Sequence, residues 1–193
     1  MNHPIPRPLR RFSLFASLLL LLTASHAAAV VRLTQRESLT PEEVELVREN
    51  QELDKRTAIF VKAVERRLAA ITGVQPTVSK SSKSSKKEKL DEDEWGVLPE
   101  STRPQLLADI ARILDEAVTN IDDAALHNEK SPLIPKALRH LAAASARMLP
   151  QLTSMRAASQ EEVERQWLEK SIESLEEIIA AAGKLPAETE KKR

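Results

Sequence analysis

Apolar side chains recur at alternating intervals of three and four residues, and this spacing constrains the fold more than any other feature of the chain. Such spacing places side chains on one face of an α-helix, because the helix has 3.6 residues per turn. A helix is therefore predicted from about Pro104 to Ala125, and its apolar stripe needs a partner to cover it. The stripe consists of Leu107, Ile110, Leu114, Ala117 and Ile121.

Two further segments have the same pattern. One helix is predicted to begin near Pro135 and contains Pro150, which lacks a backbone donor and clashes with the carbonyl of Ala146, so we expect a kink or an end there. The last helix is predicted to start at a capping box, Ser159-Gln160-Glu161-Glu162, and to stop at Gly183. Its stripe is Leu168, Ile172, Leu175, Ile179 and Ala182.

The composition agrees with helices and disfavours strands. The chain has only three glycines, two tryptophans, three phenylalanines and no tyrosine. Strand-rich folds need more turns and more aromatic and β-branched residues, whereas the abundant Ala, Leu, Glu, Lys and Arg favour helix. We therefore expect an all-α protein with a three-helix bundle over residues 96–183 and a disordered charged tail over 184–193.

A long N-terminal helix is predicted within residues 30–73. Thr40 and Glu43 form a capping box around Pro41, and the next stop signal is Gly73, so one helix over residues 41–72 would be roughly 48 Å long. Arg66 and Arg67, and a pairing of Glu52 with Arg56, are interpreted as support for this helix. A seven-residue repeat, half polar in its partner positions, consists of Leu39, Leu46, Leu53 and Phe60 with Asn50, Thr57, Val64 and Ile71.

Two interpretations of this first helix remain. Its apolar half, from Thr57 to Ile71, can dock as the fourth helix of a bundle, which is the preferred architecture. Alternatively, the helix projects and uses the heptad positions to pair with another copy or a different protein, since polar residues such as Asn50 specify register in coiled coils.

Residues 74–95 are predicted to be a flexible, disordered linker. The segment from 79 to 94 consists almost entirely of serines, five lysines and five acids, and it has too little apolar surface to offset the entropy of ordering it. The neighbouring acids neutralise the lysines, which disfavours a polybasic binding site. Trp95, directly after the acidic run, is predicted to dock onto the bundle, with a role as a recognition anchor as the alternative.

Residues 1–29 have the order of a secretory signal peptide. Arg7, Arg10 and Arg11 precede an apolar run of about a dozen residues, which is shorter than the roughly 20 that a bilayer span needs. Ala27 and Ala29 occupy the positions that signal peptidase recognises, so cleavage is expected after Ala29, or after Ala27 as the nearest alternative. Retention as an anchor and a twin-arginine route through Arg10 and Arg11 are weaker alternatives.

The sequence offers no residues that predict catalysis, a cofactor or a metal. It has no cysteine, no Gly-x-Ser-x-Gly elbow and no glycine-rich phosphate loop. The two histidines beyond the signal, His127 in a polar loop and His140 on a helix, lack the Glu-x-x-His pattern of di-iron bundles. Acidic pairs such as Asp122 and Asp123 are interpreted as solvated helix residues.

The predicted function follows from these features. Beyond the signal the chain has 26 basic and 29 acidic residues, which gives no long-range attraction to nucleic acid or to an anionic membrane, and no stable membrane span is expected after cleavage. We expect an exported, non-enzymatic helical protein of the bacterial periplasm or exterior that binds a protein or envelope component through the 41–72 helix or through the face of the bundle. The alternative is a carrier of a small apolar ligand in a cavity lined by Leu107, Leu114, Leu141, Met148, Ile172 and Leu175.

Overall fold

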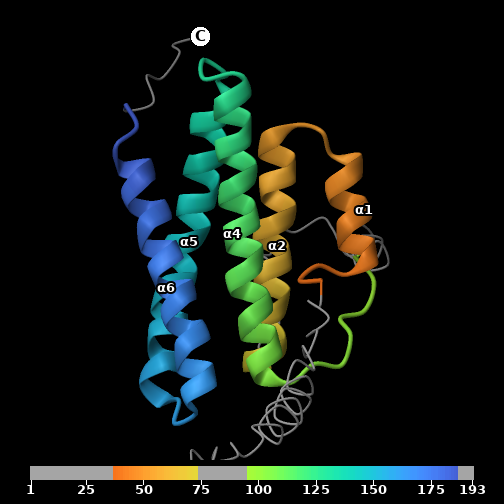
Figure 1. Ribbon diagram of the computed structural model, residues 1–193, viewed down its shortest axis with the longest axis vertical. Helices are drawn as coiled ribbons and strands as arrows, with labels where there is room; N and C mark the ends of the chain where they lie inside the picture. Colours follow the sequence, from red (N-terminus) through yellow and green to blue (C-terminus); the bar gives the residue numbers. More distant parts are fainter. Residues whose placement is uncertain (1–36, 74–94, 187–193) are drawn as a thin grey trace, which may run out of the picture. The chain divides into compact units, whose positions relative to one another are not determined.

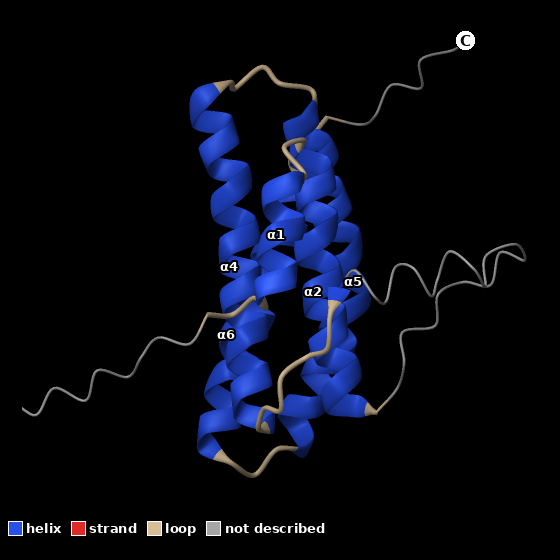
Figure 2. Ribbon diagram, turned by 90° about the vertical axis from the view of Figure 1, so that its right-hand side faces the viewer, coloured by secondary structure: helices blue, strands red, loops and turns tan. Residues whose placement is uncertain are grey.

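A computed structural model describes residues 37–73 and 95–186 of the chain (Figure 1). Within these ranges the chain forms helices and no strands (Figure 2), which confirms the predicted all-α class. The predicted signal peptide, residues 74–94 of the predicted linker and residues 187–193 of the predicted tail lie outside the described residues. The helices are α1 (Pro41–Glu49), α2 (Leu53–Thr72), α4 (Arg103–His127), α5 (Leu133–Ala158) and α6 (Glu162–Gly183).

Helices α2, α4, α5 and α6 form a four-helix bundle, which confirms that the apolar half of the 41–72 region docks onto the last three helices. Each helix packs against two neighbours, in the order α2, α4, α6, α5 and back to α2. Helices α4 and α5 are consecutive in sequence but share few contacts, so the short loop between them crosses a diagonal of the bundle. Helix α1 packs on α2 outside this square.

The predicted apolar stripes face the common core, except near the end of α6, where Ile178 is buried in place of the predicted Ile179 and Ala182. Leu107, Ile110 and Leu114 of α4 are fully or almost fully buried, and they meet Leu168 and Leu175 of α6 in the same cluster. Helix α2 is the most enclosed, because α4, α5 and α1 all pack against it. Its buried residues consequently extend around most of the helix rather than along one stripe: Leu53, Thr57, Ile59, Phe60, Val61, Ala63, Val64, Arg67 and Leu68.

The prediction of one continuous helix over residues 41–72 is wrong, because the chain turns between α1 and α2 (Figure 1). Asn50 adopts an extended conformation, and both its backbone N–H and its side-chain Nδ2 donate to the carbonyl of Leu46. The Gln51 side chain donates to the carbonyl of Arg48. These polar side chains satisfy carbonyls at the end of α1 that a longer helix would have used itself.

Because of this turn, most positions of the seven-residue repeat are buried inside the protein. Leu39, Leu46, Leu53 and Phe60 are all buried in the core cluster. Thr57, a polar position of the repeat, is also buried, and its hydroxyl donates to the carbonyl of Leu53. The repeat residues therefore pack α1 and α2 into the core of the protein, and these side chains are not available as a surface seam for a second helix.

Helix α5 continues through Pro150, so of the two expected outcomes, a kink or an end, the helix end does not occur. Pro150 and Ala146 are both exposed. The carbonyl that Pro150 leaves without its helical partner is thus on the solvent side of the helix, where water can satisfy it. Burial of Leu141, Met148 and Leu152 on the inner face of α5 offsets the free energy that the proline costs the helix.

The predicted capping box at the start of α6 is also wrong. Helix α6 begins at Glu162, and its N-cap residue Glu161 makes no side-chain capping bond. Ser159 instead donates its hydroxyl to Glu164, at 2.9 Å, and Arg103 from α4 pairs with the same carboxylate at 3.1 Å. A contact between helices therefore replaces the local cap.

Candidate functional site

A cluster of buried charges lies where α1 meets α2. The Glu43 carboxylate is 0% exposed and accepts hydrogen bonds from Arg66 Nη1 at 2.6 Å and from Arg67 Nη1 and Nη2 at 3.0 and 2.8 Å. It also accepts from the backbone N–H of Thr40 at 3.0 Å, which confirms the predicted capping box. Arg67 is 2% exposed, and its Nε lies 4.0 Å from Asp109 of α4.

The two arginines also hold backbone segments that precede and follow the α1–α2 unit. Arg67 donates to the carbonyls of Ser38 and Ala63, and Arg66 donates to the carbonyl of Gly96 at 2.6 Å. The sequence interpretation assigned Arg66 and Arg67 only to support of their own helix. The structure shows that they join the chain before α1, α1 itself, α2 and the residues after Trp95.

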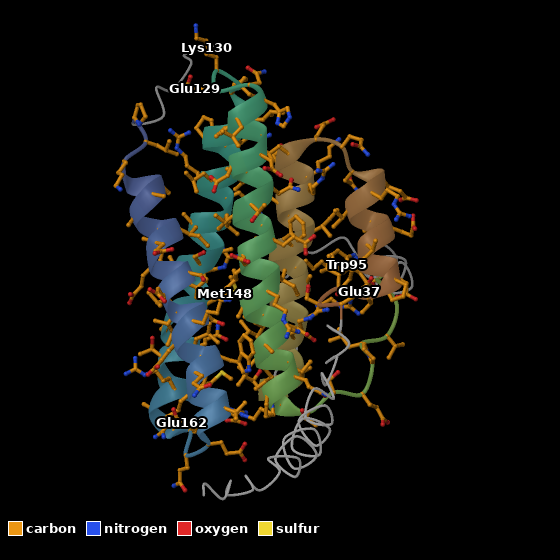
Figure 3. All side chains as sticks on the ribbon, in the orientation of Figure 1. Glu37, Trp95, Glu129, Lys130, Met148 and Glu162 are labelled. Carbon is orange, nitrogen blue, oxygen red and sulfur yellow. The ribbon has the colours of Figure 1, made fainter. Side chains whose placement is uncertain are left out.

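Trp95 docks on this cluster, as predicted (Figure 3). Its side chain is 7% exposed, with Lys62 Nζ 4.4 Å and the Arg66 guanidinium 5.4 Å from the ring centroid. Gly96 has a φ of 60°, and a Cβ added there would lie 2.8 Å from the side chain of Glu42. Glycine is thus suited to this position for both its conformation and its size.

The chemistry of this cluster is that of a structural ion-pair network. Each bond that Glu43 accepts comes from an arginine or from a backbone amide, and its carboxylate is closed off from solvent. A carboxylate that transfers protons to a ligand needs access to that ligand. The cluster therefore accounts for the docking of α1 and provides no argument for acid–base chemistry.

A pocket of about 240 Å³ lies beside the turn between α1 and α2, and it is the better candidate for binding. Asn120, Asp123, Ala124 and His127 have helical spacing and line one side from a single face of α4. Gln51, Leu53 and Arg56 line the other side from the turn and the first residues of α2. The two helices are antiparallel, so sequence positions about 70 residues apart meet here.

Arg56 is the central polar group of this pocket. Its Nε donates to the carbonyl of Asn50 at 3.2 Å, Nη1 donates to Asn120 Oδ1 at 3.3 Å, and Nη2 donates to Gln51 Oε1 at 3.2 Å. The predicted pairing with Glu52 is wrong, because Glu52 accepts from Lys55 instead. Arg56 thus has only neutral hydrogen-bond acceptors among the described residues.

The two histidines have different surroundings. His127 is the last residue of α4 rather than a loop residue, and its Nδ1 lies 2.7 Å from the backbone carbonyl of Asp123, which sets Nδ1 as the donor and leaves Nε2 toward other partners. His140 is exposed on α5. Within residues 37–73 and 95–186, no group of three or more His, Asp or Glu side chains is arranged to hold a metal ion.

The residues proposed to line a carrier cavity lie in the packed core. All six are buried in the central cluster, and none of them contributes to the pocket beside the turn. Trp167, the second tryptophan, is partly buried against this core, with the Arg112 guanidinium 5.5 Å from its ring centroid. The six residues are thus part of the packed core and are separate from the surface pocket.

The described part of the chain is an all-α protein, a four-helix bundle extended by one N-terminal helix. None of its described helices is long and apolar enough to cross a membrane. Comparisons with protein-family models, with curated proteins and with solved structures found no significant match.

Proposed function

We propose that the chain is an exported, non-enzymatic helical protein that binds another protein or a component of the bacterial cell envelope. The N-terminal 29 residues support export through their basic start, short apolar run and small residues at Ala27 and Ala29. The near-balanced charge of the remaining chain favours a partner recognised by local contacts rather than by long-range attraction.

The observation that carries the binding role is the surface around the α1–α2 turn. We call it the turn surface, and it consists of Gln51, Arg56, Asn120, Asp123, Leu126 and His127. Leu126 is 83% exposed and lies three residues from Asp123 on α4, so an apolar side chain borders the polar pocket. Arginine is enriched in protein-binding surfaces, and the amide groups of Gln51 and Asn120 can donate and accept hydrogen bonds there.

This proposal refines where the 41–72 region acts. The apolar heptad positions are occupied by internal packing, so the expected contact moves from a helical seam to the turn between the two helices. The turn presents Gln51 at the surface, and α4 supplies the other half of the contact area. A partner would therefore touch two segments that are far apart in sequence.

Site-specific photo-crosslinking tests the binding role. A photoreactive residue is placed at Gln51 or at Leu126 of the full chain, in cells that express it naturally, with a matched probe at the exposed Glu176 of α6 as the control. We expect discrete adducts from Gln51 and Leu126, none from Glu176, and loss of the Gln51 adduct in a Leu126→Asp variant. Equal labelling from all three positions would contradict the proposal.

Export is tested separately by fractionating the cells and sequencing the N-terminus of the exported protein. A mature chain that begins at Val30, or at Ala28 for the alternative cleavage, supports the signal peptide. An intact chain confined to the cytoplasm would refute export without affecting the evidence for binding.

A further inference from the structure

We propose that the pocket beside the α1–α2 turn binds a small zwitterion, an α-amino acid or a dipeptide, with its carboxylate on Arg56 and its ammonium group on Asp123. The inference goes beyond the proposed function, because it adds a small-molecule ligand to part of the turn surface. It rests on how charge is distributed around the pocket.

Arg56 is the positive group of the pocket. A guanidinium has five N–H donors, and the three contacts of Arg56 leave two of them for another acceptor. Its contacts are to one backbone carbonyl and two side-chain amides, at 3.2–3.3 Å, so none of them neutralises the charge. The partly buried Arg66 and the buried Arg67 both pair with a glutamate, whereas Arg56, also partly buried, has no carboxylate within 4.0 Å among the described residues.

Asp123 is the negative group of the pocket. It lines the same pocket from α4, and its backbone carbonyl accepts from His127, so its carboxylate is the group left for a ligand. No described cation lies within 4.0 Å of its carboxylate. Arg56 and Asp123 therefore face one space as opposite charges that are too far apart to pair with each other. A ligand that carries both charges can bridge them.

The rest of the lining combines apolar and amide side chains. Leu53 and Ala124 provide a small apolar surface, while Gln51 and Asn120 provide amide groups that both donate and accept. The pocket has a volume of about 240 Å³ and is open to solvent on one side. Its mixed lining suits a small ligand such as an amino acid or a dipeptide.

The experiment is an NMR titration of the ¹⁵N-labelled protein as purified from exporting cells. The probes are L-alanine and L-alanyl-L-alanine, with acetate and methylammonium at matched ionic strength as single-charge probes. We expect saturable shifts of the amide signals of Gln51, Arg56, Asp123 and His127 with at least one zwitterion. The tighter of the two zwitterions identifies a free amino acid or a peptide as the source of the ligand.

Charge-removing variants decide which groups carry the binding. Arg56→Gln and Asp123→Asn should each raise the Kd by about tenfold or more, since each change removes one of the two charges that hold the ligand. The neighbouring variants Lys55→Gln and Asp122→Asn remove the same charges from exposed positions outside the pocket and should leave the Kd unchanged. Asp123 is exposed, so its variant tests the site even if Arg56→Gln unfolds the turn.

Three results would overturn the inference. These are a single-charge probe that binds as tightly as the zwitterions, an equal loss of binding in the control variants, and no saturation with either zwitterion up to about 50 mM, where the binding free energy would be weaker than about 2 kcal/mol. Crosslinking from Leu126 does not depend on the pocket ligand. Failure of this inference is therefore distinguishable from failure of the proposed binding role.

Discussion

Replacing Glu43 by glutamine should destabilise the protein strongly, because the change removes the negative charge between two arginines. Glutamine has nearly the same shape, but its amide donor would face the donors of Arg66 and Arg67. Breaking one side of a buried ion pair typically costs 3–5 kcal/mol. Asp109 lies 4.0 Å from Arg67 and retains part of the compensation, so we expect a loss of about 3 kcal/mol in the free energy of unfolding.

Urea denaturation followed by circular dichroism measures this loss. Glu42→Gln and Glu45→Gln change the same charge at exposed positions of α1 and should alter the free energy of unfolding by less than about 0.5 kcal/mol. Glu43→Leu combined with Arg67→Met should cost less than the sum of the two single changes, because it removes both buried charges together. A loss below about 1 kcal/mol for Glu43→Gln would refute the reasoning, since it would mean that water solvates these arginines.

Further predictions concern the backbone and titratable groups. Pro150→Ala should raise the free energy of unfolding by about 2 kcal/mol, measured in urea, because it restores a helical hydrogen bond and removes a clash. Gly96→Ala should lower it by about 1 kcal/mol or more, since alanine at a φ of 60° is strained and its Cβ would press on the neighbouring glutamate side chain; no change would refute the strain. The hydrogen bond from Lys136 lowers the pKa of Asp54. The ionised Asp54 therefore stabilises the fold above the ordinary value of 3.8, and this stabilisation is lost as the pH falls through the folded-state pKa. Asp54→Asn should consequently flatten the acid limb of a pH–stability curve. Partial desolvation raises the pKa of Glu116, although the residue is exposed at the surface, so its ionisation costs a little stability at neutral pH. Glu116→Gln should stabilise the protein slightly at pH 7, and the gain should vanish below the ordinary value of 4.5, whereas a constant gain would contradict this cause.

The local features of this protein follow from its sequence because they depend on neighbouring residues. The three-and-four spacing of Leu107, Ile110 and Leu114 predicted a helix and its buried face, and the structure confirms both. Gly73 adopts the left-handed conformation that ends α2, and the last helix ends at Gly183. Each of these signals acts within one or two helical turns, which is the range over which propensity and capping operate.

Local rules failed where a distant contact replaced a local one. The capping pattern at Ser159 was present, but Glu164 took up both the serine hydroxyl and Arg103. The repeat through Leu46 and Leu53 was compatible with a single helix, yet a turn at Asn50 buries both residues against the bundle. Sequence spacing cannot distinguish these outcomes, because it does not contain the energy of contacts between elements.

The sequence by itself determined the helical class, the stripes that must be buried and most of the helix ends. Only the tertiary structure decided which stripes meet, where α1 folds back, and how Glu43 comes to lie between arginines more than 20 residues away. It also decided that Arg56 and Asp123 share a pocket. The physical reason is that burial and charge compensation depend on the relative positions of whole helices, which the packing of the entire core fixes together.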